Sequence, residues 1–221
     1  MTSAVEPPPA PAASATRRME QYREERSRIV RAAFELIGRG PGSRPVSVND
    51  ILGAAGLSTR AFYRHFRSKD ELILTMYRTA AERLGEELSA AVGAAPGPSE
   101  ALEAWVRQHL AVVFDPRRAR QASVLSSAEA RAVPGFDEMH QQLGVVHRTI
   151  LAEVLRQGAR AGVFPGVGDA DEDARAVHSV VGGLVNARLA GMPTPDWAGA
   201  TEHTTSLFLR AFGSGGGRPK R

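Results

Sequence analysis

Residues 47–72 read SVNDILGAAGLSTRAFYRHFRSKDEL, and this stretch decides the fold. Ser47 precedes a short apolar segment and has Asp50 three residues later, which resembles a capping-box start of a helix. Gly56 follows two alanines, at a place where a helix ending in a left-handed residue favours glycine. Ser58 then caps a second short helix. Two short helices that meet at a glycine corner are typical of a helix-turn-helix.

The second of these helices separates an apolar stripe from a polar surface. Phe62 and Phe66 are four residues apart and therefore lie on one face. The remaining surface concentrates donors that suit DNA, because arginine reads guanine bidentately and Thr, Tyr or His can bind phosphate. The alternative interpretation is a solvated polar face on a structural helix. A third cap follows, where Ser68 and Glu71 form an S-x-x-E box. The three caps, the glycine corner and an excess of basic residues in the N-terminal part favour DNA reading.

The same window resembles the DNA-binding domain of the tetracycline-repressor (TetR) family. The matching segments are AAGLS at residues 54–58, FYRHF at residues 62–66 and SKDEL at residues 68–72. The similarity covers roughly residues 24–75, about a quarter of the chain. The remainder matches the family only in helical layout and length.

The resemblance implies a set of DNA contacts. Thr59, Arg60 and Arg64 would face base edges. The residues expected to bind phosphate are Ser47, Tyr63, His65 and Lys69. The loop GRGPGSRPV at residues 38–46 is longer and richer in Pro and Gly than the family pattern, and it adds Arg44 as a phosphate contact. The complete set is Arg44, Ser47, Ser58, Thr59, Arg60, Tyr63, Arg64, His65 and Lys69.

Basic residues are concentrated in the N-terminal third of the chain. Residues 1–80 hold thirteen Lys or Arg against eight Asp or Glu, whereas residues 81–221 hold fifteen against sixteen. Within a net charge of +4, this imbalance suggests that the N-terminal part meets a polyanion. Nearly all the cations are arginine, which suits phosphate and guanine binding, although a GC-rich genome explains the bias equally well.

Composition excludes several classes of protein. Hydrophobic residues make up 43% of the chain, as in soluble globular proteins. No apolar run approaches the roughly 20 residues of a membrane span, and residues 1–20 lack the apolar core of a secretory signal. The chain has no cysteine, which excludes disulfides and thiolate metal sites and suits a reducing compartment. We expect a cytoplasmic protein.

The pattern of apolar residues predicts an all-α fold with about nine helices, arranged as an N-terminal three-helix helix-turn-helix head and a C-terminal helical bundle body. We expect a disordered arm over residues 1–18 and a TetR-type DNA-binding domain over residues 19–70. After this domain we expect an effector-binding and dimerisation domain over residues 71–212. The chain is then expected to end in a flexible basic tail over residues 213–221. Beyond the head, the helices are expected near residues 99–114, 117–131, 136–161, 171–190 and 196–212.

For the body, the resemblance implies a small-molecule effector pocket and a four-helix dimer interface. An apolar helix that contains two adjacent glycines suits the close approach of another helix, and an ordinary monomer core is the alternative. The candidate pocket residues, each of which is also a plausible core or solvated residue, are Trp105, His109, Phe114, Met139 and His140. The candidate interface residues are Val181, Gly182, Leu184, Val185, Leu207 and Phe208.

These observations predict a sequence-specific DNA-binding transcriptional regulator, a ligand-responsive repressor that binds a palindromic operator as a homodimer. A nonspecific architectural DNA-binding protein and a helical enzyme are the alternatives. We expect no enzymatic activity, because no phosphate-binding loop, nucleophile arrangement or reactive cysteine is present. We also expect no cofactor and no metal, because no H-x-x-x-H or E-x-x-H pair stands at helical spacing, and DEMH at residues 137–140 is by itself too unspecific for a metal site.

Overall fold

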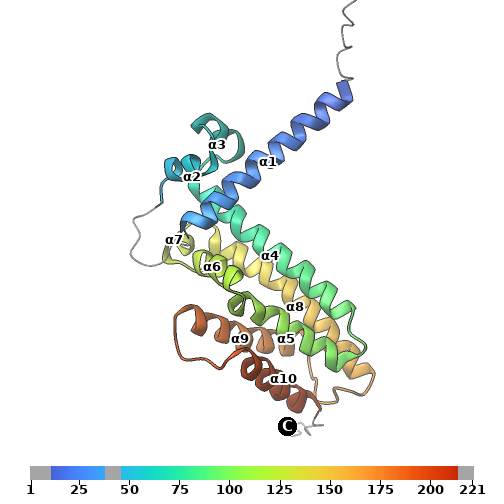
Figure 1. Cartoon of the computed structure of the whole chain (residues 1–221). Coiled ribbons are helices and arrows are strands. Elements are labelled where there is room, and N and C mark those ends of the chain that lie inside the picture. The colour runs from blue at the N-terminus through green and yellow to red at the C-terminus, as the bar shows by residue number, and fades with distance from the viewer. Residues whose placement is uncertain (1–10, 38–45, 214–221) are drawn as a thin grey trace, which may run out of the picture. The chain divides into compact units, whose positions relative to one another are not determined.

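The computed structural model describes residues 11–37 and 46–213, which form ten α-helices and no β-strand. The all-α prediction, with three helices in the head and a helical body, is confirmed. None of the helices in these ranges combines the length and apolarity that crossing a membrane requires. Figure 1 shows the helices, which are α1 (Pro11–Ile37), α2 (Val48–Ala55), α3 (Thr59–His65), α4 (Lys69–Gly93), α5 (Pro98–Phe114), α6 (Pro116–Leu125), α7 (Ala128–Arg131), α8 (Phe136–Arg160), α9 (Ala170–Leu189) and α10 (Trp197–Gly213).

The chain divides into two compact units between Leu72 and Ile73, within the first turns of α4. The first unit, which we call the head, contains α1, α2 and α3. The second unit, which we call the body, contains the rest of α4 and all later helices. Each unit is described below by itself.

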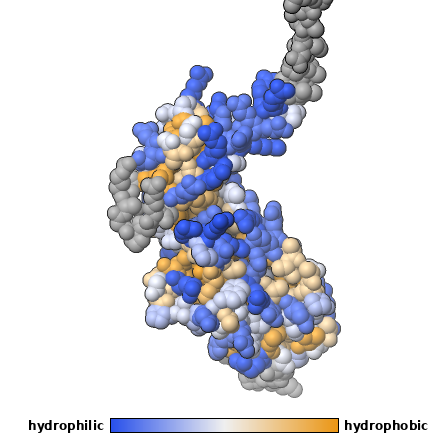
Figure 2. Space-filling view, in the orientation of Figure 1, coloured by the Kyte–Doolittle hydropathy of each residue, from blue (hydrophilic) through white to orange (hydrophobic). Residues whose placement is uncertain are grey.

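Helix α1 begins at Pro11, inside the segment that we expected to be a disordered arm over residues 1–18. Proline is favoured in the first turn of a helix, and the Ala- and Arg-containing sequence that follows has good helix propensity without a further breaker. Residues 15–24 are exposed and mostly polar, and Figure 2 shows this end of α1 as a hydrophilic surface. Residues 1–10, 38–45 and 214–221 lie outside the described residues.

The single helix predicted near residues 117–131 is two helices, α6 and α7, which accounts for ten helices in place of nine. Ser126 ends α6, and the hydroxyl of Ser127 accepts a hydrogen bond from Ala130 N at 3.2 Å to start α7. Serine side chains compete with the helical ladder for backbone donors, so two adjacent serines favour a break.

The core of the body is built around α5, which packs against α6, α8, α9 and α10. Trp105, Leu102 and Leu110 on α5 are fully buried. From the neighbouring helices, Leu151 and Val177 are equally buried in the same cluster. Because apolar side chains surround α5 on several sides, its position is fixed by packing.

Gly158 on α8 is required by the close approach of Phe164. After α8 the chain turns back, and the amides of Val163 and Phe164 both donate to the Gly158 carbonyl, at 2.9 and 3.0 Å. A Cβ atom on residue 158 would lie 2.0 Å from Phe164 Cδ2. The Phe164 ring, itself buried, therefore occupies the space of the missing side chain.

Gly158→Ala should lower the free energy of unfolding by about 1–3 kcal/mol, because the buried ring of Phe164 must move to admit a methyl group. Urea denaturation of the full chain at one protein concentration measures this. Gly53→Ala is the matched control: a Cβ there meets nothing within 4 Å, and alanine in a helix is favoured over glycine by roughly 0.5–1 kcal/mol. Equal midpoints for Gly158→Ala and the wild type would contradict the packing argument.

Candidate nucleic-acid interface

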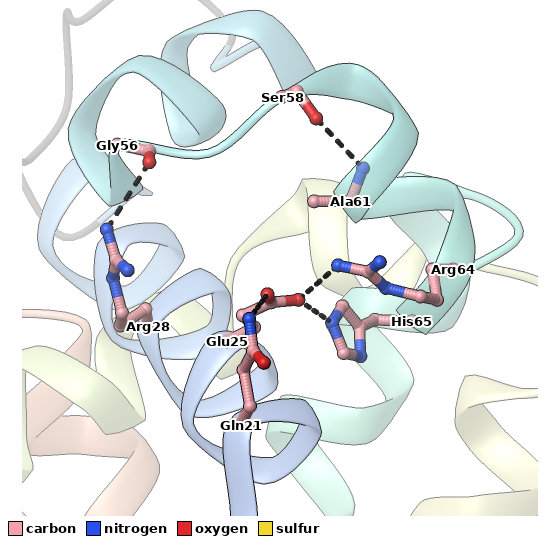
Figure 3. A network of polar contacts seen from close by, with 8 residues as sticks. All are labelled: Gln21, Glu25, Arg28, Gly56, Ser58, Ala61, Arg64 and His65. Carbon is pink, nitrogen blue, oxygen red and sulfur yellow. Dashed lines mark hydrogen bonds and ion pairs between the residues drawn. The ribbon is translucent and has the colours of Figure 1, made fainter. Parts of the chain in front are cut away.

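The corner between α2 and α3 has the caps that the sequence predicts. Ser47 Oγ accepts from Asp50 N at 3.2 Å, while Asp50 Oδ2 accepts from Ser47 N at 2.9 Å. Helix α2 ends at Gly56, whose φ of 62° is left-handed. At the start of α3, Ser58 Oγ accepts from Ala61 N at 3.3 Å (Figure 3). The predicted helix-turn-helix corner is confirmed.

Phe62 and Phe66 fix the orientation of α3 in the head. They are 0% and 1% exposed, with ring centroids 5.7 Å apart. From α1, the guanidinium carbon of Arg26 lies 5.1 Å from the centroid of the Phe66 ring. Because these rings define the inward side of α3, the opposite side of the helix faces solvent.

Thr59, Arg60, Tyr63 and Arg64 form the exposed side of α3, which we call the α3 face. Tyr63 is 61% exposed and the side chain of Arg64 is 52% exposed. The α3 face contains two guanidinium groups and two hydroxyls and no carboxylate. It therefore offers the donors that base edges and phosphates accept.

The prediction that His65 contacts phosphate is wrong for this structure, because its side chain is fully buried. His65 Nε2 lies 3.0 Å from Glu25 Oε2, and its ring centroid lies 4.2 Å from that of Tyr22 on α1. The reason is helical geometry: residue 65 is three positions after Phe62 and lies on the same inward side. His65 is a packing residue between α3 and α1.

Three further predicted contacts lie at the ends of α2, α3 and α4. The hydroxyls of Ser47 and Ser58 already act in helix caps, and Ser47 also donates to Asp50 at 2.7 Å. Lys69 is half-buried in the first turn of α4 and has an interaction partner of its own. Arg44 lies outside the described residues. The structure thus places the four residues of the α3 face on one exposed side of the helix. Contacts of DNA with Arg44, Ser47, Ser58 and Lys69 stay predictions.

Glu25 on α1 binds two residues of α3 at once (Figure 3). Its Oε2 forms an ion pair with Arg64 and a hydrogen bond with His65, and Gln21 Nε2 donates to Oε1 at 3.4 Å. The hydrogen bond with His65 lowers the pKa of the Glu25 carboxyl; burial opposes this shift, and Arg64 supports it. Glu25 therefore stays ionised at neutral pH and ties α3 to α1.

Arg28 on α1 closes the end of α2. Its Nη2 donates to the carbonyl of Ala55 and, at 3.3 Å, to that of Gly56. A cation at a helix C-terminus satisfies free carbonyls and interacts favourably with the helix dipole. Sequence analysis missed both Glu25 and Arg28, because their partners are 27–40 residues away along the chain.

Comparison with known proteins shows similarity to one family of regulators. The profile of "Bacterial regulatory proteins, tetR family" matches residues 29–76. The transcriptional regulator BetI of Brucella anthropi is 37% identical over 81 residues, which span 37% of this chain and only 41% of that relative. BetI of Rhizobium meliloti is 28% identical over 194 residues, or 86% of this chain and 92% of the relative.

The chain is thus similar to the TetR family, whose profile spans residues 29–76. It is a DNA-binding transcriptional regulator. The fold agrees: the solved structure of NalD from Pseudomonas aeruginosa, a secondary repressor of a multidrug efflux pump, superposes with a TM-score of 0.64. The two share 23% sequence identity, and the match covers 86% of this chain and 97% of NalD.

In this chain the five candidate effector residues do not share one environment. Trp105 is fully buried and stacks on His109, with ring centroids 4.4 Å apart. Phe114 is half-buried beneath the guanidinium of Arg188, 3.9 Å from its ring centroid. His140 is exposed and hydrogen-bonds to the Tyr77 hydroxyl. Met139 is half-buried beside it in the sequence.

The candidate interface residues fall into two groups. Val181 and Phe208 are 0% and 7% exposed and belong to the core of their own body, so the prediction that they face a partner is wrong for this structure. The reason is helical spacing, since Val181 continues the buried stripe of α9. The second group is at least partly accessible. Leu207 is 41% exposed, and a Cβ on Gly182 would meet nothing within 4 Å. Leu184 and Val185 are partly exposed.

Glu25→Ala should destabilise the head by about 1–3 kcal/mol at pH 7, because the buried Nε2 of His65 loses its partner. Since the pKa of Glu25 is lowered in the folded state, its contribution is present above the ordinary carboxyl pKa of 4.5 and is lost as the pH falls below it. The deficit of Glu25→Ala should therefore shrink in acid.

Thermal unfolding followed by circular dichroism from pH 7 to pH 3.5 measures this difference. Glu24→Ala is the matched control, because Glu24 is the adjacent, exposed carboxylate of α1. A Glu25→Ala deficit that is no larger than that of Glu24→Ala, or that does not change with pH, would show that the network is not stabilising.

Proposed function

We propose that this regulator is a homodimeric, ligand-responsive repressor that binds a palindromic DNA operator. In this proposal residues 19–70 bind DNA, and residues 71–212 bind an effector and dimerise. The protein acts on DNA in the cytoplasm and catalyses no reaction. The observation that carries the proposal is the exposed, cationic α3 face; the relative NalD, a repressor by its title, adds support.

The α3 face would enter the major groove of the operator. Arg60 and Thr59 at the start of α3 would reach base edges, as the N-terminal residues of recognition helices do. Tyr63 and the edge residues Ser47 and Lys69 would bind phosphate. Arg64 would join the base contacts by exchanging Glu25 for a DNA acceptor, since its side chain is half exposed.

A single head would be too small for tight, specific binding, because one recognition helix reads only a few base pairs. Two heads related by a twofold axis would read two half-sites. The proposed interface consists of the outward sides of α9 and α10, where Val180 and Leu207 are 44% and 41% exposed. Next to Val180, a Cβ on Gly182 or Gly183 would meet nothing within 4 Å, which leaves room for a partner helix.

Ligand response requires an effector that binds one conformation of the dimer better than another. The proposed effector is a small molecule that binds the body and favours a dimer whose recognition helices no longer fit successive major grooves. The change in operator affinity depends on how much more tightly the effector binds one conformation of the dimer than the other. Tight binding that is equal for both conformations would change nothing.

Selection of bound duplexes from a random pool by the purified full-length chain tests the proposal and supplies the operator. A palindromic motif is the expected result. Against that operator, Arg60→Ala should cost about 1–3 kcal/mol and relax the preference at one base position. The loss on scrambled DNA should be smaller.

Tyr63→Phe should behave differently, because it removes only a hydroxyl that would bind phosphate. A loss of about 0.5–1.5 kcal/mol, similar on operator and scrambled DNA, is expected. Arg120→Ala, an exposed arginine of α6 in the body, controls for total charge. Equal losses for Arg60→Ala on both DNAs, or no enriched motif, would favour nonspecific DNA binding and refute base reading.

Leu207→Glu and Val180→Glu should each shift the dimer toward monomer, because a carboxylate buried in an apolar interface costs several kcal/mol unless it is paired. Sedimentation velocity over a range of concentrations measures the change in dimer dissociation constant. Val163→Glu is the matched control, since Val163 is 39% exposed after α8. Unchanged dimers of both variants would place the interface elsewhere.

A further inference from the structure

Three histidines from three different helices meet inside the body. His109 lies on α5, His147 on α8 and His178 on α9. Each offers one ring nitrogen, and these three nitrogens all lie within 4.8 Å of one another. His109 and His147 are 7% and 6% exposed, and His178 is half-buried. We call these residues the histidine cluster.

The three rings are arranged around a common centre. The ring of His109 is nearly perpendicular to those of His147 and His178, at 84° and 87°, with centroids 5.4 and 5.2 Å apart. The Trp105 ring stacks on His109, with centroids 4.4 Å apart. Trp105 Nε1 also donates to the backbone carbonyl of His147 at 3.1 Å, which fixes α8 against α5.

The hydrogen bonds of the cluster leave nitrogens available for a ligand. His147 Nε2 lies 3.0 Å from the Ala81 carbonyl, and because a carbonyl can only accept, Nε2 carries the proton and Nδ1 keeps its lone pair. This is the second-shell arrangement that orients metal-binding histidines. His109 Nδ1 is buried and finds no hydrogen-bond partner among the described residues. A buried polar nitrogen without a partner indicates a missing ligand.

The three imidazoles are neutral at physiological pH, which is the form that binds a metal. Burial is the largest cause for each of them: it lowers the pKa of His178 to about 4, and it lowers the pKa of His109 and His147 as well. Arg148 adds to the shift at His178 and His147, and the other histidines and Arg118 add to it at His109.

From this arrangement we infer that His109, His147 and His178 bind one divalent transition-metal ion of the zinc class. Three imidazoles are a known ligand set for Zn²⁺, and the fourth position of the tetrahedron stays open for water or a small ligand. Imidazole nitrogen also suits Co²⁺, Ni²⁺ and Cu²⁺, whereas Mg²⁺ and Ca²⁺ prefer oxygen.

The charges around the cluster do not themselves attract a cation. Arg118 is paired with Glu87 at 2.8 Å, but Arg148 repels a cation. An ion held mainly by long-range attraction is therefore disfavoured, and binding depends on direct bonds to nitrogen. Nitrogens on a tetrahedral ion at about 2.05 Å lie roughly 3.4 Å apart. Rotation of the side chains must close the remaining distance on binding.

The test uses the untagged full-length chain, stripped of metal with a chelator and desalted. Zn²⁺ affinity is measured by competition with a chromophoric chelator, and Co²⁺ is added separately as a spectroscopic probe. The wild type should bind one ion per chain, show the intense visible bands of tetrahedral Co²⁺ and melt at a higher temperature with Zn²⁺. His178→Ala and His147→Ala should each weaken Zn²⁺ binding by more than roughly 100-fold.

His203→Ala is the matched control, because His203 is an exposed histidine of α10 outside the cluster, and its Zn²⁺ affinity should equal that of the wild type. Circular dichroism of the metal-free variants checks that they fold, and His178→Ala replaces the least buried ligand. A folded wild type that binds no Zn²⁺, or a folded His147→Ala/His178→Ala double variant that binds it as tightly, would overturn the inference. Either result would leave the proposed repressor function untouched.

Discussion

The exposed α3 face depends on the burial of two rings on the inward side, Phe62 in the seven-residue α3 and Phe66 directly after it. A helix as short as α3 has few hydrogen bonds of its own and cannot hold its orientation alone. Once Phe62 and Phe66 are buried, the direction of every other side chain follows from the helical repeat. Arg60 and Tyr63 are thereby turned outward, and the Tyr63 ring packs edge-to-face on Phe62, with ring centroids 5.4 Å apart. The surface proposed to read DNA is therefore a consequence of packing on the opposite side.

Helix α1 changes how the charge of the head should be interpreted. The excess of arginine in residues 1–80 suggests a broad cationic surface, but Arg28 is used to close α2, and Arg64 is paired with Glu25. These two arginines therefore stabilise the head instead of adding to a free cationic surface. Of the two arginines on the α3 face, Arg64 is held by its ion pair with Glu25, whereas the position of Arg60 does not depend on that ion pair. Specificity in such a head arises from a few oriented donors rather than from net charge.

Local signals in the sequence predicted local structure well. The caps at Ser47 and Ser58, the glycine corner and the phenylalanine stripe are each encoded within four residues, and all were found. Predictions failed where the outcome depended on tertiary packing. His65 has a polar side chain, yet α1 covers it. The histidine cluster brings together residues on three helices, and a search for ligand pairs along one helix could not find it.

Helix α9 connects the two proposals made for the body. His178 lies half-buried in the histidine cluster, whereas Val180 and Gly183, within two turns of it, lie on the outward side proposed to meet a partner. A helix is stiff over such a distance, so any movement of the α9 backbone that accompanies rotation of the His178 side chain would also shift the outward side. Close-packed interfaces respond to such shifts by changing register rather than by deforming. Such a movement would reach the proposed interface through α9 itself, without a longer path of contacts.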